Sequence, residues 1–149
     1  MKLVQIYTDG ACSYNPGPGG WGAILLYGNA KKCISGGDKN TTNNKMELIA
    51  VISALNCLKE QCEVKVYSDS AYVVNAFLQG WIDKWKANGW KIQNKKVKNL
   101  ELWQQLDKLV NYHKVEFIKV KGHSDNAFNN ECDSLARAEV DKILGGQYE

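Results

Sequence analysis

Four acidic residues stand at the ends of regular segments or beside their apolar faces, and together their side chains could do chemistry. Asp9 ends the alternating segment KLVQIYTD, and Asp69 ends the similar segment EVKVYSD. Glu47 and Asp133 each lie near the start of a segment with helical periodicity, beside its apolar face. Carboxylate oxygens are the ligands that Mg²⁺ and Mn²⁺ prefer. If the fold brings these acids together, the sequence predicts a divalent metal site.

Each acid also has an ordinary structural explanation. Asp9 precedes a glycine, as in many turns, and Asp69 precedes a helical segment whose dipole favours a negative charge. Glu47 and Asp133 each follow an asparagine by three positions, the spacing of a capping box. These explanations do not account for four acids in one place, because clustered carboxylates repel one another unless cations neutralise them. Two metal ions about 4 Å apart would suit phosphodiester hydrolysis, since they stabilise the attacking and the leaving oxygen.

Hydrophobic periodicity predicts the elements that must position these acids. Alternation of apolar and polar residues predicts strands at 2–9, 20–28, 31–37, 63–69 and 114–120. Apolar spacings of three and four residues predict helices within 43–60, 71–78, 99–112 and 130–144. The final residues, 145–149, are expected to form a frayed tail. A chain of 149 residues with this pattern predicts a single α/β domain that covers 1–149.

The order of the elements predicts a mixed five-stranded sheet flanked by helices. The first three strands follow one another without a helix between them, as in an antiparallel meander. Helices separate the last two strands from each other and from the meander, so both are expected to run parallel to the first strand. The carboxyl ends of parallel neighbours meet at one edge of a sheet, where α/β proteins place ligands. Asp9 and Asp69 are therefore predicted to lie side by side.

Positive charge is concentrated in the segment 80–98. This segment has six lysines and one aspartate, a net charge of +5, whereas the rest of the chain has a net charge of −2. A solvated charged surface is the simplest interpretation of such a segment. Three tryptophans lie between the lysines. Trp85 and Trp90 are expected to pack and anchor the segment, and Trp81 to offer a contact surface.

Composition places the chain among ordinary soluble domains, with 44% hydrophobic and 23% charged residues. It has no run of 18 apolar residues, so the sequence predicts no membrane-spanning helix. The chain starts on a strand pattern without the features of a signal peptide, so we expect a cytoplasmic protein. Its five cysteines form no C-x-x-C pair, so free thiols are expected rather than disulfides or a zinc site.

Four segments closely resemble, in unbroken order, the motifs of bacterial type 1 ribonuclease H. They are YTDGACSYNPGPGGWG, TTNNKMEL, VYSDSAYV and VKGHSDNAFNNECDSLA. This resemblance implies a ribonuclease H-like fold and an endoribonuclease that needs Mg²⁺, for which Mn²⁺ could substitute. It implies that the catalytic, metal-binding carboxylates are Asp9, Glu47, Asp69 and Asp133. His123 would aid proton transfer or product release, although an isolated histidine in a polar loop is more often a surface residue.

The resemblance also implies the substrate, an RNA–DNA hybrid whose RNA strand is cut to leave 5′-phosphate and 3′-hydroxyl ends. The 2′-hydroxyl distinguishes RNA from DNA, and polar groups near the acids are suited to read it. The segment GWIDKWKANGWK resembles the basic protrusion of the family, whose lysines would attract phosphates without reading sequence. The residues expected to contact the hybrid are Cys12, Asn15, Thr42, Asn43, Asn44, Trp81, Lys84 and Lys86.

These contacts have alternatives of their own. Asparagines are common in loops and helix caps, so each asparagine could have a purely structural role. Ala71 stands where relatives often carry a glutamine that touches the RNA, so the substrate preference could differ here.

Three other functions can be compared with this one. A catalytically inactive module that binds hybrids or double-stranded RNA would have a broken carboxylate set, whereas all four acids are present. Another nuclease of the same superfamily, such as a resolvase or integrase core, leaves the tryptophan–lysine segment unexplained. A plain structural domain leaves the clustering of acids unexplained. We expect a monomer that has no membrane partner.

Overall fold

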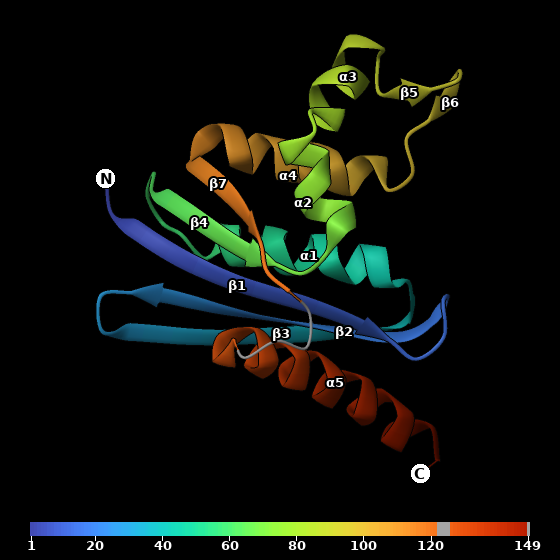
Figure 1. Ribbon diagram of the computed structural model, residues 1–149. Helices are drawn as coiled ribbons and strands as arrows, with labels where there is room; N and C mark the ends of the chain where they lie inside the picture. Colours follow the sequence, from blue (N-terminus) through green and yellow to red (C-terminus); the bar gives the residue numbers. More distant parts are fainter. Residues whose placement is uncertain (122–125, 149) are drawn as a thin grey trace.

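A mixed five-stranded sheet lies at the centre of the protein, in a computed structural model that describes residues 1–121 and 126–148 (Figure 1). Its strands, in the order in which they lie side by side, are β3 (Ala30–Thr41), β2 (Gly17–Tyr27), β1 (Leu3–Cys12), β4 (Glu63–Ser68) and β7 (Lys114–Lys119). β1 pairs with β2 antiparallel and with β4 parallel, and β4 pairs with β7 parallel. The predicted fold, with three antiparallel strands and two further parallel strands, is confirmed.

Helices cover both faces of this sheet because its central strands are apolar on both sides. α1 (Asn43–Asn56) lies on one face and α5 (Ala127–Tyr148) lies on the other (Figure 1). Along β1, Val4 and Ile6 belong to the core on the α1 side, whereas Tyr7 packs on the α5 side. This alternation follows from the two-residue period of a strand. None of the described helices has the length and apolar character that crossing a membrane requires.

α1 begins at Asn43 because Thr42, and not Asn44, is its N-cap. The Thr42 Oγ1 accepts a hydrogen bond from the Lys45 N–H at 3.2 Å. The alternative explanation of Glu47, a capping box with Asn44, is therefore wrong. Glu47 instead faces the sheet and is buried, as are the apolar residues Leu48, Val51, Ile52 and Leu55. Burying each of these apolar side chains contributes roughly 1.5–3 kcal/mol, which holds α1 against the sheet.

α5 is longer than the helix predicted at 130–144. The Asn126 Oδ1 accepts a hydrogen bond from the Asn129 N–H at 3.0 Å, so the helix starts before Asn130. The alternative explanation of Asp133, a capping box with Asn130, is therefore wrong, and Asp133 lies in the second turn. The helix also continues through the glycine pair that was expected to open a frayed tail. A glycine weakens a helix by about 1 kcal/mol, which does not end it by itself.

The edge strand β3 is also longer than the strand predicted at 31–37. It pairs with β2 along most of its length, with a register shift between Gly17 and Gly19. Most of its residues are exposed, so no alternation of burial marks its full extent in the sequence. The added length carries the chain to Thr41, directly before the cap of α1.

The segment 80–98 extends beyond the sheet, as the resemblance implied (Figure 1). Its elements, with the helices on either side, are α2 (Ala71–Leu78), α3 (Trp81–Ala87), β5 (Lys91–Ile92), β6 (Lys95–Lys96) and α4 (Leu100–Tyr112). The ring of Trp85 packs edge-on against the fully buried Trp103, with 5.3 Å between the ring centroids. Trp90 also packs against the core, as expected. The tryptophans thus anchor an otherwise exposed hairpin.

Two glycines in β2 let α5 approach the sheet closely. A Cβ at Gly20 would collide with the carbonyl oxygen of Ala136, and a Cβ at Gly22 would lie 2.6 Å from the Leu135 Cβ. Only glycine fits at these positions while the helix stays where it is. Because Gly22 pairs with Asp9 across the sheet, this contact also fixes α5 relative to Asp9.

We predict that Gly22→Ala lowers the free energy of unfolding by about 1–3 kcal/mol, because the added methyl group overpacks the contact between β2 and α5. Urea titration followed by tryptophan fluorescence measures this change. Gly145→Ala is the matched control, because a Cβ at Gly145 meets nothing within 4 Å and alanine is favoured in a helix. If Gly22→Ala were as stable as the unchanged protein, the close approach of α5 would be contradicted.

Candidate active site

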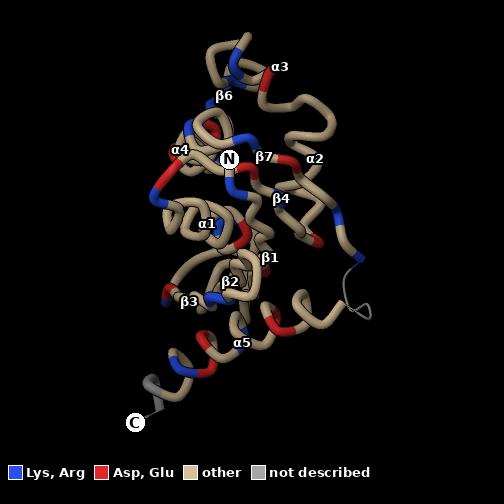
Figure 2. The backbone as a smooth tube through the Cα atoms, turned by 90° about the vertical axis from the view of Figure 1, so that its left-hand side faces the viewer, with Lys and Arg blue, Asp and Glu red and all other residues tan. Residues whose placement is uncertain are grey.

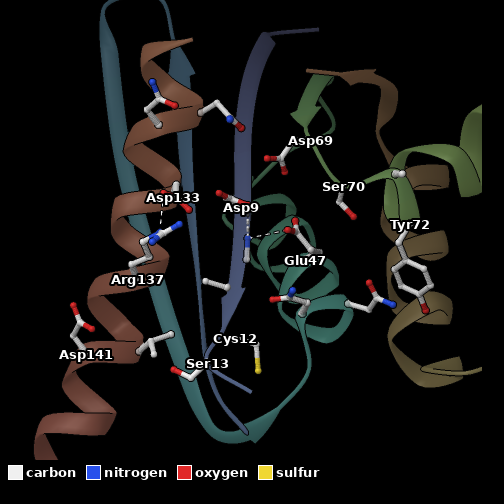
Figure 3. A pocket seen from close by; sticks show the side chains of 18 of the residues that line it. Asp9, Cys12, Ser13, Glu47, Asp69, Ser70, Tyr72, Asp133, Arg137 and Asp141 are labelled. Atoms are coloured by element: carbon white, nitrogen blue, oxygen red, sulfur yellow. Dashed lines mark hydrogen bonds and ion pairs between the residues drawn. The ribbon is translucent and has the colours of Figure 1, made fainter. Parts of the chain in front are cut away.

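Three carboxylates meet at the edge of the sheet where β4 ends beside β1 (Figure 3). The parallel register pairs Thr8 with Ser68, so Asp9 and Asp69, each one residue further along, emerge side by side. Glu47 reaches the same place from α1. One oxygen from each of Asp9, Glu47 and Asp69 lies within 4.8 Å of the others. The structure therefore brings these three acids together, as the sequence analysis expected.

Gly10 lets α1 come close enough to bring Glu47 into this group. A Cβ at Gly10 would lie 2.8 Å from the backbone nitrogen of Glu47, so a larger residue would push the helix away. The Gly10 N–H donates hydrogen bonds to the Asp9 Oδ1 at 2.9 Å and to the Glu47 Oε1 at 3.1 Å. This shared donor holds the two carboxylates next to each other. The second oxygen of Glu47, Oε2, is buried and has no hydrogen-bond partner in the described part of the chain.

Burial and mutual repulsion disfavour the charged forms of these acids. Burial, followed by the charge of Asp69, raises the pKa of Asp9 to about 7. Burial, followed by the charge of Asp9, raises the pKa of Glu47 well above its ordinary value of 4.5. Asp9 is only 6% exposed and Glu47 only 8%, so water screens little of the repulsion. A divalent cation would remove it, and the unpartnered Glu47 oxygen among close carboxylates suits Mg²⁺ or Mn²⁺.

The fourth predicted acid, Asp133, lines the same cavity from α5 but lies outside the group of three (Figure 3). Its Oδ2 is paired with the Arg137 Nε at 3.0 Å, one helical turn further along. The charge of Asp133 still contributes to raising the pKa of Asp9. The cavity has a volume of about 740 Å³. This volume is much larger than metal ions need, so the cavity has room for part of a substrate as well.

The predicted substrate contacts near the acids divide into residues that line the cavity and residues that hold its walls. Cys12, Asn43 and Asn44 line it. Asn15 accepts a hydrogen bond through Oδ1 from the Asn43 N–H at 3.1 Å, which ties the loop between β1 and β2 to the start of α1. Thr42 caps α1. Asn15 and Thr42 therefore have structural roles, and their contacts with a hybrid stay predictions.

The predicted contacts in the protrusion come from a separate part of the fold (Figure 2). Trp81 is half-buried, and its ring lies 6.4 Å from the ring of Trp85, so Trp81 packs as well as facing solvent. Lys84 and Lys86 are exposed. The Lys86 Nζ lies 2.8 Å from the Asp107 Oδ2, so this lysine also ties α3 to α4. His123 lies outside the described residues, and its role stays a prediction.

The cavity also includes residues that the sequence analysis did not treat as site residues. Ser70, Tyr72, Arg137 and Asp141 line it. Ser70 is also the N-cap of α2, because its Oγ accepts a hydrogen bond from the Val73 N–H at 3.3 Å. Arg137 had a signal in the sequence, its place four residues after Asp133. Tyr72 and Asp141 had none, because their positions depend on how α2 and α5 pack.

An α/β sheet with clustered carboxylates at the ends of two parallel strands suits a metal-dependent enzyme of phosphodiester hydrolysis. The RNase H family model matches residues 1–141 of this chain. The chain therefore belongs to the RNase H family, and it is a nuclease.

Two curated relatives agree with this assignment over nearly their whole length. Ribonuclease H of Acetivibrio thermocellus is 67% identical over 143 residues, which cover 95% of this chain and 97% of that protein. Ribonuclease H of Chlorobaculum parvum is 61% identical over 140 residues, which cover 93% of this chain and 96% of that protein.

Solved structures of the family have the same fold. LC9-RNase H1, a type 1 RNase H with the type 2 active-site motif, has a TM-score of 0.86 and 31% identity, covering 95% of this chain and 74% of that chain. LC11-RNase H1, solved in complex with an RNA/DNA hybrid, has a TM-score of 0.72 and 25% identity, covering 95% of this chain and 99% of that chain.

We predict that Asp9→Asn raises the free energy of unfolding of the metal-free protein by about 1–3 kcal/mol at pH 8, because it removes a buried, repelled charge. The folded-state pKa of Asp9 is raised from 3.8 to about 7, so the stability linked to its protonation is complete below pH 3.8 and is lost as the pH rises through about 7. Urea titrations in EDTA at pH 5 and pH 8 measure the effect.

The control for this prediction is Asp38→Asn, which changes an exposed carboxylate on β3 and keeps the oxygen that accepts from the Asn40 N–H. Mg²⁺ should stabilise the unchanged protein and Asp38→Asn much more than Asp9→Asn. A metal-free Asp9→Asn protein that is less stable than the unchanged protein at pH 8 would show that repulsion does not govern this site.

Proposed function

We propose that this protein is an endoribonuclease that hydrolyses the RNA strand of RNA–DNA hybrids with Mg²⁺ bound at its four acids, leaving 5′-phosphate and 3′-hydroxyl ends. The observation that carries the proposal is the close group of Asp9, Glu47 and Asp69, in which one Glu47 oxygen has no partner among the described residues. Membership of the RNase H family supports the reaction. The likeness to LC11-RNase H1, which was solved with an RNA/DNA hybrid, supports the substrate.

In this proposal the chain's own residues hold the metal ions and the scissile phosphate in a fixed arrangement. Asp9, Glu47 and Asp69 would bind the cation, while the Gly10 N–H keeps two of these carboxylates in place. Asp133 would add a fourth carboxylate from α5. The chemistry that bound divalent cations supply here is activation of water and stabilisation of negative charge on the phosphate oxygens. The raised pKa values of Asp9 and Glu47 mean that both acids bind metal in their charged forms more readily as the pH rises.

The loop after β1 and the start of α1 are suited to recognise the RNA strand. Cys12, Asn43 and Asn44 line the cavity next to the acids. A 2′-hydroxyl both donates and accepts hydrogen bonds, and asparagine side chains offer both functions. The hydrogen bond between Asn15 and Asn43 keeps the two walls at a fixed separation. Ala71 also lines the cavity, but its methyl group can only make apolar contact with the substrate.

The protrusion is proposed to bind the DNA backbone. Its six lysines are all exposed, and Trp85 and Trp90 anchor the segment that carries them. Lysine supplies attraction to phosphates without reading bases, which fits an enzyme that must act on hybrids of any sequence. Trp81 would contact sugars with the exposed part of its ring.

His123 is proposed to aid proton transfer or product release. The elements on either side of it in the sequence are β7, which pairs with β4, and α5, which carries Asp133. In the cell we propose that the protein works as a cytoplasmic monomer that removes RNA primers and RNA paired with DNA.

We predict that the protein with Mg²⁺ cuts only the RNA strand of a labelled hybrid, that EDTA stops the cleavage, and that Asp9→Asn slows it by about 10³-fold. This loss corresponds to several kcal/mol of charge stabilisation at the reacting phosphate. Single-stranded RNA and duplex RNA are the control substrates, and Asp38→Asn is the control variant. Tight binding of the hybrid without cleavage would instead identify an inactive binding module, and cleavage of duplex RNA at the same rate would identify another kind of nuclease.

We also predict that the triple variant Lys84→Gln, Lys95→Gln, Lys96→Gln weakens hybrid binding by about tenfold or more at moderate salt and flattens its salt dependence. Each lost phosphate contact changes the slope of log affinity against log salt by about 0.7–0.9. The matched control changes three exposed lysines outside the protrusion, Lys32, Lys59 and Lys114, to glutamine. Equal weakening by both triple variants would mean that overall charge, and not the protrusion, binds the hybrid.

A further inference from the structure

Arg137 is the single arginine among the 19 basic residues of this chain, and it lies in the wall of the active-site cavity. Arginine differs from lysine because its guanidinium is a planar fork of five N–H donors. Such a fork can bind one acceptor along each of two edges, whereas a lysine ammonium acts as a point charge. Because the only arginine of the chain lies in the cavity wall, its guanidinium can bind two acceptors there.

The helix directs the Arg137 side chain toward Asp133 (Figure 3). One acid stands a turn before it, Asp133, and another stands a turn after it, Asp141. Long side chains in a helix point back toward its N-terminus, and the ion pair forms with Asp133, from the Arg137 Nε to the Oδ2 at 3.0 Å. This is the one ion pair of Arg137 within residues 1–121 and 126–145. Because it uses Nε, the far edge of the fork, formed by Nη1 and Nη2, remains for a second acceptor.

A purely structural ion pair would not need an arginine. The other ion pairs among the described residues all use lysine, with N–O distances from 2.6 to 3.2 Å. Exposed pairs at this helical spacing contribute about 0.3–0.5 kcal/mol whichever base forms them. The Arg137 side chain is 64% exposed, whereas that of Asp133 is 31% exposed. The guanidinium therefore stays accessible to a ligand that enters the cavity.

The charges around the cavity favour one position for a substrate phosphate that faces no bound metal ion. Five acids line the cavity, and Arg137 is the one cationic side chain among its described lining residues. A nucleic-acid strand brings a negative charge at every linkage. The acids repel each of these phosphates, except where bound cations or the guanidinium face them. Arginine pairs with phosphate through two parallel N–H···O bonds, which fix position as well as supplying attraction.

We propose that Arg137 is a substrate-binding residue, which holds Asp133 through Nε and binds one backbone phosphate next to the cleaved linkage through Nη1 and Nη2. Asp133 fixes the guanidinium before the substrate arrives, so the phosphate meets a preorganised fork. The assignment rests on the proposed function, since it adds a contact between the same site and the same substrate.

The test removes the charge from one phosphate at a time. A set of hybrids is made in which the cleavable strand has a short ribonucleotide block. Each hybrid carries one methylphosphonate, and the hybrids differ in which linkage around the cleavage site carries it. Each methylphosphonate follows a 2′-deoxynucleotide, because a neighbouring 2′-hydroxyl would attack the neutral linkage. The reference hybrid has the same 2′-deoxynucleotide with an ordinary phosphate. Values of kcat, KM and the hybrid dissociation constant are measured for the unchanged protein, Arg137→Gln and Arg137→Lys.

We expect Arg137→Gln to lower kcat/KM on the reference hybrid by about tenfold to a hundredfold, as for the loss of a charged hydrogen bond. At one linkage, the methylphosphonate should lower the kcat/KM of the unchanged protein by a similar factor. At that linkage it should not lower the kcat/KM of Arg137→Gln any further. Arg137→Lys should recover part of the loss, because it keeps the charge but not the fork.

Lys142→Gln is the matched control, because it breaks another exposed ion pair of α5, with Glu139, and Lys142 is not among the residues that line the cavity. Two results would overturn the phosphate contact. In the first, the kcat/KM losses caused by Arg137→Gln and by the methylphosphonate multiply at every linkage. In the second, the Arg137→Gln protein is as active as the Lys142→Gln protein. If Arg137→Gln fails to fold, as circular dichroism would show, the same comparison is made with Arg137→Lys. If the unchanged protein binds the reference hybrid but does not cut it, the proposed function fails, and the dissociation constants still decide whether Arg137 contacts a phosphate.

Discussion

The mutual repulsion of three clustered carboxylates, two of them buried, is the constraint on which the rest of the structure depends. Asp9, Glu47 and Asp69 place oxygens within 4.8 Å of one another, and water screens Asp9 and Glu47 poorly because both are buried. A domain of this size has only about 5–15 kcal/mol of net stability, so acids held this close need firm support. The parallel pairing of β1 with β4 supplies part of that support, and the Gly10 N–H supplies another part by bonding two of the acids at once.

The two regions proposed to meet the substrate are positioned in opposite ways. Around the acids, glycines bring backbones together: Gly10 admits α1, and Gly22 admits α5. Backbone contacts leave little room for adjustment, which suits ligands that must stay at fixed distances from a metal ion. The protrusion instead depends on large side chains, because Trp85 packs on Trp103 and Trp90 reaches the core. The positions of its lysines are fixed only approximately, which is sufficient for attraction to phosphates.

The sheet topology and the meeting of Asp9 with Asp69 could be predicted because strand periodicity and the parallel crossover rule are strong constraints. Glu47 could be placed on the buried side from its helical phase. The caps of α1 and α5 could not be predicted, since neighbouring residues such as Thr42 and Asn44 can both cap a helix and the fold selects between them. The places of Tyr72 and Asp141 in the cavity wall, and the half-burial of Trp81, depend on packing between elements and have no counterpart in local sequence.

α5 is the last element of the chain, and it supplies both Asp133 and the cover over Tyr7 and Ile24. During synthesis the N-terminal part of a chain leaves the ribosome first. A chain made as far as β7 already contains the three clustered acids, but it lacks the fourth acid, Arg137 and one whole layer of the fold. The site and the domain are therefore completed by the same event, the packing of α5 on the sheet.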